Sequence, residues 1–476
     1  MVRARDRRMS TLEGRAEESL WPVVEHVVRT HGLAGLAVGV VQDGKVALAR
    51  GFGTRDVRTG APVTPETLFH VASVSKTFVA AAVVGTEPAL DLDAPVVRWL
   101  PDLTLADGRQ EEVTLRHLLT HTSGIPDVVD YGWHDPQLGD DALDVLVRGL
   151  SAVRLTTAPG TQFAYCNLGY EVLGHALATL RGTTFEAAMT DLVLDPAGMH
   201  HSTFLRADVA PDLAAAPHVG VPLVVPGDAY PYTRRHAPSS TLHSSVADLS
   251  LWMVATLDDR AAARRWQPEA DVGDPPWDEA VGLGWFLGTY RGERTVGHSG
   301  ADPGFGSRLV LVPERRTGVV VLANSNTVPT SAVLRAVLDT VLDLPQHAAG
   351  TDEPHLGALL PPITVPLGQA LAGSGTAAAV DVYHRLTSAV PPTVDDDDEC
   401  FADGVWGAIE LHRPDLVRPL LDVWTAVRPG SSQAWAMTGW AHLVDGDTGP
   451  AAELLQRGLD LDAGNEDAAT LLRGLV

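Results

Sequence analysis

Two residue types are nearly absent from this sequence, and each absence is informative. The chain of 476 residues has two cysteines, Cys166 and Cys400, which lie far apart. Such a pair cannot form a disulfide framework or a cysteine-based metal motif, so we interpret both as ordinary thiols. Lysine is equally rare, because only Lys45 and Lys76 among the 35 basic residues are lysine. Where the protein needs only a positive charge, it uses arginine.

Positive charge is scarce as well. The chain has 60 acidic residues against 35 basic ones, which gives a formal net charge of −25. This balance argues against a nucleic-acid partner and against an anionic membrane surface. The apolar content of 45% is nevertheless sufficient for a packed core, and the length allows two to four domains.

Long apolar segments are also missing. Residues 1–8 are basic, but residues 9–18 carry charges where a signal peptide would have its apolar core. The longest uncharged stretch, residues 356–380, is interrupted by three prolines and does not predict a membrane helix. We therefore expect a cytoplasmic protein without a membrane span.

The pattern of apolar residues predicts an α+β fold. An amphipathic helix is expected over residues 10–30, and the Asp43-Gly44 turn predicts a hairpin of residues 35–41 and 46–50. Residues 75–260 are mostly helical in pattern. Further strands and a helix are predicted late in the chain, over residues 283–287, 295–298, 307–312, 317–323 and 331–342. These features predict an antiparallel sheet closed by distant segments and flanked by helices, with a helical insertion at about 90–260.

The C-terminal part has a different organisation. Residues 346–397 are rich in proline, alanine and glycine, and we interpret them as a linker with the first helices. Similar residue pairs then recur at an interval of 34 positions between 398 and 476, as Phe401-Ala402 does at Trp435-Ala436. This period resembles tetratricopeptide helical hairpins and predicts an all-α helical-repeat domain. A chance match between generic helical hairpins is the alternative. The repeats would allow binding to a protein partner or self-association.

One of the two lysines lies where chemistry is plausible. Lys76 follows Ser73 by three positions in an apolar segment that is helical in pattern, so both side chains share one face. Unlike arginine, a desolvated lysine can lose its proton and accept the proton of a hydroxyl group. A solvated helix that contains Ser-x-x-Lys by chance is the simpler alternative for this motif alone.

Two other segments carry polar residues at turns. Tyr165-Cys-Asn167 precedes a helical pattern, where Tyr165 would be a core aromatic and Asn167 a helix cap. Gly297 to Ala301 lies at the end of a predicted strand, where small residues let a substrate approach the backbone. A simple turn explains this second segment equally well.

Taken together and in this order, the three motifs resemble the active-site triplet of the penicillin-recognising serine hydrolases. This family includes class C β-lactamases, D-alanyl-D-alanine carboxypeptidases and related esterases. The similarity extends over roughly residues 15–345, and the segments that carry it are 68–78, 113–124, 159–170 and 297–305. The resemblance implies a β-lactamase-like domain at 10–345.

The resemblance also implies a role for each motif residue. Ser73 would be the acyl-accepting nucleophile, Lys76 its base, and Tyr165 the group that passes a proton to the leaving group. The substrate would be bound by Asn167, His298, Ser299 and Gly300. The backbone N–H groups of Ser73 and Ala301 would form an oxyanion hole. In the segment 114–124, His117 and His121 are expected to belong to a capped helix and a tight turn, outside catalysis. Neither a metal nor a cofactor is implied.

The substrate is less well defined than the mechanism. His298 stands where a typical β-lactamase has lysine, and neutral histidine would hold a substrate carboxylate less firmly. A dedicated deacylating glutamate is not evident either. We therefore expect a serine hydrolase or acyltransferase for peptide, D-amino-acid, ester or amide substrates. The alternatives are a β-lactamase and a non-hydrolytic sensor of penicillin or peptides. A Gly-x-Ser-x-Gly elbow, a P-loop and a His-Glu-x-x-His helix are all lacking.

Overall fold

The protein is described by a computed structural model of most of the chain. The described residues are 11–86, 90–128, 131–219, 223–225, 227–259, 262–274, 277–325, 327–345, 356–410 and 414–475.

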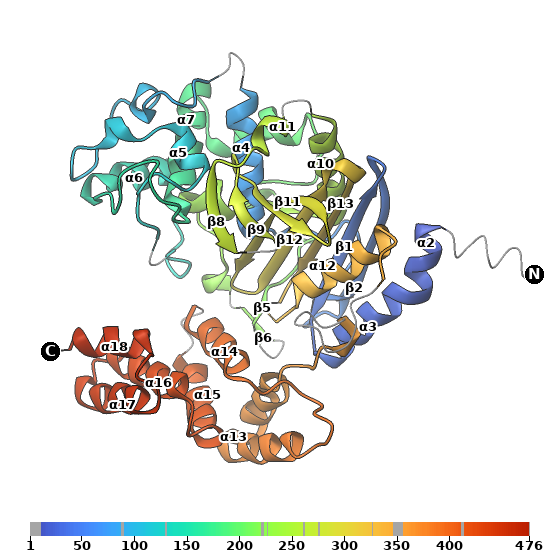
Figure 1. The fold of residues 1–476 in the computed structure, drawn as a ribbon, viewed down its shortest axis with the longest axis vertical. Coiled ribbons are helices and arrows are strands. Elements are labelled where there is room, and N and C mark those ends of the chain that lie inside the picture. The colour runs from blue at the N-terminus through green and yellow to red at the C-terminus, as the bar shows by residue number, and fades with distance from the viewer. Residues whose placement is uncertain are drawn as a thin grey trace, which may run out of the picture.

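A nine-stranded antiparallel sheet forms the centre of the first 345 residues (Figure 1). Its strands, in spatial order, are β3 (Ala61–Pro62), β2 (Lys45–Asp56), β1 (Gly35–Gln42), β13 (Thr317–Ala323), β12 (Phe305–Val312), β11 (Glu293–Asp302), β10 (Phe286–Tyr290), β9 (Asp278–Val281) and β8 (Ala270–Asp274). β1 pairs with β13 from the other end of the region, with Leu36 opposite Ala323. The prediction of one sheet closed by distant segments is confirmed.

Local sequence explains the first hairpin. β1 and β2 are joined at Asp43 and Gly44, whose φ angles are 53° and 72°. Two successive residues with positive φ are typical of the tight turn that Asp-Gly favours, and that turn matches the twist of the paired strands. The hairpin predicted around these two residues is confirmed.

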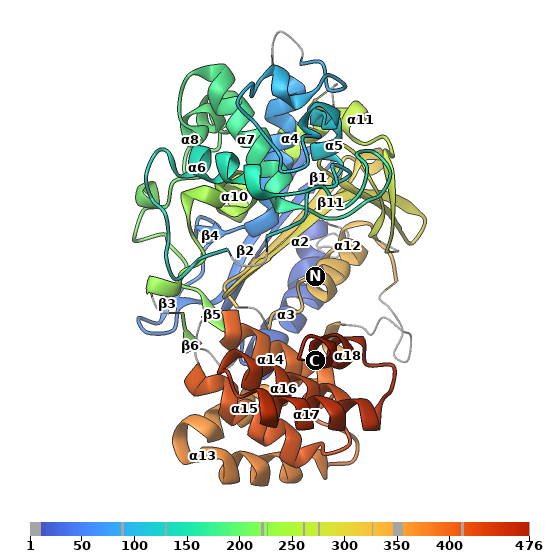
Figure 2. The same cartoon turned by 90° about the vertical axis from the view of Figure 1, so that its left-hand side faces the viewer.

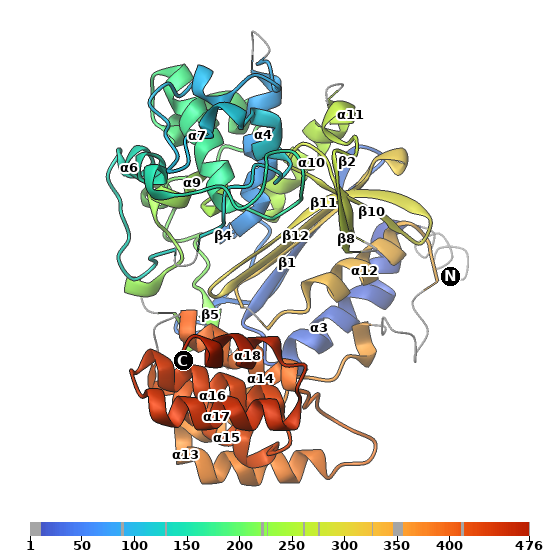
Figure 3. The same cartoon turned by 60° about the vertical axis from the view of Figure 1, so that its left-hand side comes forward.

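Helices cover both faces of the sheet (Figure 3). α2 (Leu12–Arg15), α3 (Trp21–Thr30) and α12 (Thr330–Val341) bury apolar side chains against one face. The other face carries the larger helical layer, which contains α4 (Ser75–Gly85), α5 (Leu115–Leu119), α6 (Ala142–Gly149), α7 (Asn167–Arg181), α8 (Phe185–Met189), α9 (Ala237–Ser240), α10 (Val246–Asp258) and α11 (Ala262–Arg265). The nucleophile candidate lies between this layer and the sheet.

The C-terminal helices form a separate layer beside the rest of the molecule (Figure 2). They are α13 (Thr364–Thr387), α14 (Asp398–Glu410), α15 (Pro414–Val427), α16 (Ser432–Val444), α17 (Thr448–Leu461) and α18 (Glu466–Arg473). α14, α16 and α18 begin at residues 398, 432 and 466, and α15 and α17 at 414 and 448, which is an interval of 34 in each case. A C-terminal helical region is confirmed, while its likeness to tetratricopeptide hairpins and the domain boundaries stay predictions.

The C-terminal part of the chain is in contact with the rest of the molecule. The short turn Leu356–Ala358 packs against α3, and Leu356 belongs to the core on that face of the sheet. α14 contacts β5 (His218–Val219), a short strand outside the main sheet. Within the described residues, none of the helices is both long enough and apolar enough to cross a bilayer.

Candidate active site

Ser73 lies at a strained bend just before α4. It belongs to a short 3-10 turn, Ala72–Val74, and Ala72 has a φ of 46°. Alanine rarely adopts this backbone conformation, which costs about 1–3 kcal/mol and tends to occur at functional sites. Lys76 follows in the first turn of α4, and its Nζ donates a hydrogen bond to Ser73 Oγ at 2.9 Å. The predicted pair of hydroxyl and amine is therefore in contact.

Lys76 is completely buried, which is unusual for lysine. Its amine lies 5.0 Å from the centre of the Tyr165 ring and 5.6 Å from that of Tyr170. Burial lowers the pKa of Lys76 from its usual value to about 8, although the negative charges of Glu171, Asp302 and Asp127 oppose this effect. A substantial fraction of the amine is thus neutral near pH 8, as a general base requires.

Two acceptors complete the surroundings of the amine. Lys76 Nζ donates to Asn167 Oδ1 at 2.6 Å and to the carbonyl oxygen of Ser239 at 2.9 Å. Asn167 is the first residue of α7, and Ser239 lies in α9. The fold thus brings three separate helices of the helical layer together around one amine.

Tyr165 lies close to both Ser73 and Lys76. Burial raises the pKa of its phenol above the usual value, and the nearby side chain of Ser73 partly opposes this effect. The ring stacks on His121, with ring centres 4.4 Å apart. His121 Nδ1 in turn accepts a hydrogen bond from the backbone N–H of Cys166 at 3.0 Å. Through these two contacts, His121 holds the segment of Tyr165 and Cys166 in place.

His298 is a buried, neutral acceptor. Its Nδ1 donates to the carbonyl oxygen of Ser299 at 2.6 Å, which leaves Nε2 without a hydrogen on the neutral ring. Nε2 is buried and has no hydrogen-bond partner among the described residues. Burial and the nearby charge of Lys76 lower the pKa of His298 to about 3. This side chain can accept a hydrogen bond, but it offers no positive charge.

The strand that carries His298 has an open edge next to Ser73. β10 pairs with β11 only as far as Gly297, so residues 298–302 have no β10 partner. Gly300 lies on this edge and packs against the turn that contains Ser73. A Cβ atom at Gly300 would be only 2.9 Å from the backbone nitrogen of Ser73. Ser299 and Ala301, which alternate with it, are exposed. A glycine is thus required for β11 to approach Ser73 so closely.

Four residues in the surroundings of Lys76 are not expected from the sequence motifs. Asp127 hydrogen-bonds to Asn167, as does the hydroxyl of Tyr131.

Two further carboxylates lie near the amine. Glu171, four positions after Asn167 on α7, accepts hydrogen bonds from Ser239 Oγ and His236 Nδ1. Asp302 accepts from His70 Nε2 at 2.7 Å and from Ser240. A weak signal existed for Glu171, because residues four apart share a helix face.

The segment 114–124 behaves as predicted. Thr114 caps α5 in a capping box with His117, and Gly124 has a φ of 74° at the following turn. His117 thus has the structural role that was expected.

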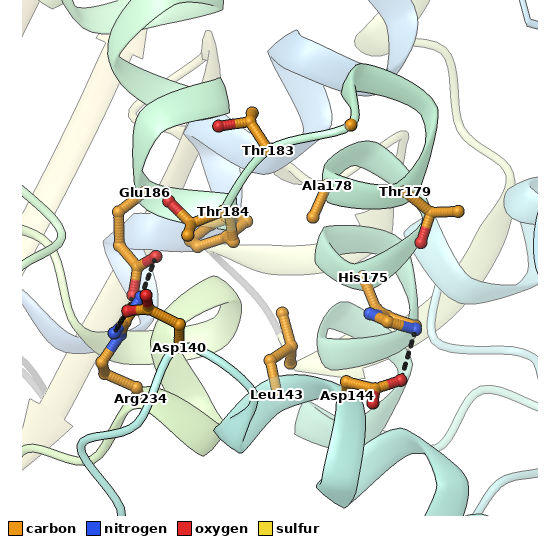
Figure 4. A pocket seen from close by; sticks show the side chains of 12 residues that line it. Asp140, Leu143, Asp144, His175, Ala178, Thr179, Thr183, Thr184, Glu186 and Arg234 are labelled. Atoms are coloured by element: carbon orange, nitrogen blue, oxygen red, sulfur yellow. Dashed lines mark hydrogen bonds and ion pairs between the residues drawn. The ribbon is translucent and has the colours of Figure 1, made fainter.

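A separate cavity of about 340 Å³ lies between α6, α7 and α8 (Figure 4). Its lining includes Asp144 and His175, whose Oδ1 and Nε2 atoms are 3.4 Å apart. It also includes Arg234, which forms an ion pair with Glu186. None of the motif residues lines this cavity. Ser73 is half-buried and lies apart from this cavity, beside the open edge of β11.

The chain is similar to known proteins over much of its length. The family model described as beta-lactamase matches residues 22–343. The chain belongs to the beta-lactamase family. It is similar to "Protein flp" of Staphylococcus aureus (strain MW2), with 27% identity over 325 residues that cover 66% of this chain and 64% of that protein. "Esterase EstB" of Burkholderia gladioli is 38% identical over 215 residues, or 42% of this chain and 54% of the esterase.

A solved structure shows the same fold. It is the octameric penicillin-binding protein homologue from Pyrococcus abyssi, with a TM-score of 0.59 and 26% identity, and the match covers 74% of this chain and 80% of that chain. The predicted resemblance to the β-lactamase and penicillin-binding-protein group is confirmed. The chain spans slightly less than two thirds of the length of Protein flp, and the family match ends before the C-terminal helices.

Proposed function

We propose that this beta-lactamase family member is a serine hydrolase or acyltransferase that forms an acyl-enzyme on Ser73. One observation carries the proposal: a fully buried lysine amine, with its pKa lowered to about 8, is hydrogen-bonded to Ser73 Oγ at 2.9 Å. A buried amine at this place costs stability, and a general base is a direct reason to keep it there.

The proposed reaction has two stages. In the first, Ser73 Oγ attacks the acyl carbon while Lys76 takes its proton, and backbone N–H groups of Ser73 and Ala301 stabilise the oxyanion. The carbon–leaving-group bond then breaks, and Tyr165 passes a proton to the departing atom. In the second stage, water or an amine attacks the ester on Ser73, and the proton it loses returns through the same groups to the serine oxygen.

The charges around the site favour substrates without a carboxylate near the scissile bond. Glu171, Asp302 and Asp127 all act on Lys76, and His298 is neutral. A substrate carboxylate would meet these negative charges without a fixed lysine at position 298 to hold it. We therefore favour neutral or amine-bearing esters, amides and peptides, including those of D-amino acids, over β-lactams. The similarity to a protein named as an esterase supports the ester class.

The C-terminal helices are proposed to bind a partner or a second copy of the chain. Trp406 is 47% exposed, and its ring lies 5.7 Å from that of Trp440 on the next hairpin. Exposed aromatic side chains are common in protein interfaces. The solved relative from Pyrococcus abyssi is described as octameric, which supports self-association as one form of this proposal. Light scattering of the purified protein would measure this self-association directly.

A substrate screen tests the proposed activity. p-Nitrophenyl esters, D-amino-acid p-nitroanilides and a chromogenic cephalosporin are compared, and intact mass is recorded during turnover. We expect repeated turnover of the neutral and amine-bearing substrates and a transient acyl adduct. An adduct that forms once and persists with every substrate would identify a sensor instead of an enzyme. Absence of both turnover and any adduct with every substrate would refute the proposal.

A further inference from the structure

The geometry around Lys76 places a demand on its neutral form. The amine has three neighbours, namely Ser73 Oγ, Asn167 Oδ1 and the carbonyl oxygen of Ser239. A neutral amine has only two hydrogens and one lone pair, so one of the three neighbours must donate to it. The carbonyl of Ser239 can only accept. The lone pair therefore faces Ser73 only if Asn167 also presents an acceptor.

Asn167 has two ends, and its orientation decides which end Lys76 meets. The amide presents either its oxygen, an acceptor, or its NH₂ group, a donor. If the amide were turned over, the NH₂ group would compete with the Ser73 hydroxyl for the lone pair of Lys76. The base would then point at the wrong neighbour.

Asp127 excludes that second orientation. Its Oδ2 accepts a hydrogen bond from Asn167 Nδ2 at 2.9 Å, and its Oδ1 accepts from the backbone N–H of the same residue at 2.7 Å. An ionised carboxylate can only accept, so the NH₂ group must face Asp127. The remaining amide hydrogen is directed at the hydroxyl of Tyr131. Both donors of Asn167 thus have protein partners, and its oxygen faces Lys76.

We propose that Asp127 is a positioning residue which, through the amide of Asn167, directs the lone pair of neutral Lys76 at Ser73. The proposal rests on the proposed function of Ser73 and Lys76. It also gives Asn167 a different role from the substrate contact that the resemblance implies, because its amide hydrogens are already engaged within the protein. Asp127 comes from a loop that the sequence motifs do not include, and it acts without touching the reacting atoms.

Other charged and titratable groups surround the same amine and must be considered in any test. Glu171 reaches it from α7 and Asp302 from β11, and both raise the pKa of Lys76, as does Asp127. Cys166 also raises it slightly, while His121 and His298 are buried and themselves held neutral near Lys76. Removing the charge of Asp127 should therefore lower the pKa of Lys76, whereas Glu171 and Asp302 remain in place.

The first experiment measures Ser73 labelling by a fluorophosphonate, and hydrolysis of a p-nitrophenyl ester, as functions of pH in the Asp127→Asn variant. The new amide presents a donor to one of the two N–H groups of Asn167, so the fixed orientation is lost. We expect the plateau rate to fall about 10- to 100-fold, the range for a misdirected general base. The acid limb of the pH–rate profile, where the rate falls as the pH decreases, should shift to lower pH, because the pKa of Lys76 is lowered. The matched control is Asp135→Asn, an exposed acid of the same loop that contacts Gln137, for which both rate and limb should stay unchanged.

A second variant separates positioning from damage to the fold. In the double variant Asp127→Asn/Asn167→Asp, the carboxylate and the amide exchange places. The new carboxylate at position 167 always offers an acceptor to Lys76, and the new amide at position 127 can donate to it and still accept from the backbone N–H. We expect this exchange to recover at least part of the lost plateau rate and to move the acid limb back to higher pH. A role limited to stabilising α7 predicts no such recovery.

The outcomes distinguish this proposal from the proposed function. If the wild-type protein neither labels nor hydrolyses, the proposed function fails and the positioning role fails with it. If the wild type is active but Asp127→Asn keeps its plateau rate and its acid limb, only the positioning role is refuted. The same conclusion follows if the exchanged pair is no faster than Asp127→Asn, with thermal melts showing that both variants are folded.

Discussion

The sheet-containing region and the C-terminal helices differ most in what they bury. The first region buries ionisable and amide side chains such as Lys76, Glu171 and Asn167. Among the residues that the structure describes after 356, the buried polar side chains are only Thr364 and Ser431. The core of the C-terminal helices is apolar and aromatic. In it the rings of Phe401 and Trp424 are stacked, with their centres 5.5 Å apart.

We interpret this difference as an indication of where each region has its function. Burying a charged or unpaired polar group costs stability, so such groups persist where they serve a function. In the first region, Lys76, Asn167 and Glu171 are buried groups of this kind close to Ser73. The C-terminal helices have an interior that apolar packing explains, and any binding function of theirs must lie on the surface. The following experiments test this division, beginning with the largest expected effect.

Removing the proposed nucleophile should have the largest effect. Ser73→Ala is expected to abolish labelling by a fluorophosphonate, measured by intact mass, because its hydroxyl is the one that Lys76 contacts. Ser75→Ala is the matched control. Ser75 Oγ is buried and accepts a hydrogen bond from the backbone N–H of Leu242. This variant should still label but lose about 1–3 kcal/mol of stability, seen as a lower melting temperature. An adduct on Ser73→Ala would remove this residue from its proposed role.

The next largest effect should come from Lys76→Arg. Arginine keeps the positive charge but cannot supply a neutral base, so we expect a 10²- to 10⁴-fold loss of kcat/KM. Lys45→Arg, at the exposed turn of the first hairpin, is the control for the same chemical change and should be fully active. Near-normal turnover of a correctly folded Lys76→Arg protein, as judged by circular dichroism, would contradict the base assignment.

A pH profile should show a smaller effect with a defined sign. As the proposed base, Lys76 would act only when neutral, and its pKa is lowered to about 8. Below about pH 7, kcat/KM should therefore fall about tenfold for each pH unit. The pKa of His298 is lowered to about 3, and that of Tyr165 is raised, so neither adds a limb near neutral pH. A profile that stays flat down to about pH 5 would show that another group accepts the proton.

The smallest effect on chemistry is expected from removal of the C-terminal helices. A chain ending at Leu360 retains Leu356 in the core beside α3 and loses α13 to α18. It should keep most of its activity on a small activated ester, since the motif residues all lie earlier. Loss of solubility would be consistent with exposure of the face that the helices cover. A soluble, folded truncated protein without activity would show that the helices complete the site.

The features that could be predicted from the sequence are those with a local cause. The turn at Asp43 and Gly44 follows from the backbone preferences of these two residues. Contact between Ser73 and Lys76 follows from their spacing of three on one helical face. The beginnings of α14, α16 and α18 follow the 34-residue period of the sequence.

The features that could not be predicted depend on tertiary contacts. β8, at the edge of the sheet, and its neighbour β9 are short strands with many polar residues, so the alternation of apolar and polar residues is weak in both. Asp127 lies in a loop 40 residues before Asn167, and no periodicity relates the two. The role of His121 likewise depends on stacking against Tyr165, which only the folded chain brings about. In each case the partner is set by the packing of separate elements.

The pairing of β1 with β13 also has a kinetic consequence. Leu36 meets Ala323 across about 290 residues, so the middle of the sheet is formed by a contact of very long range. Contacts of this kind form slowly, because closing so large a loop costs entropy before the pairing repays it. During synthesis, β1 must wait beside β2 with one edge open until β13 leaves the ribosome. The C-terminal helices, which contact mainly their neighbours along the chain, can fold as soon as they are made. A newly made molecule therefore completes its serine site late, when the last strands of the sheet join strands that were made first.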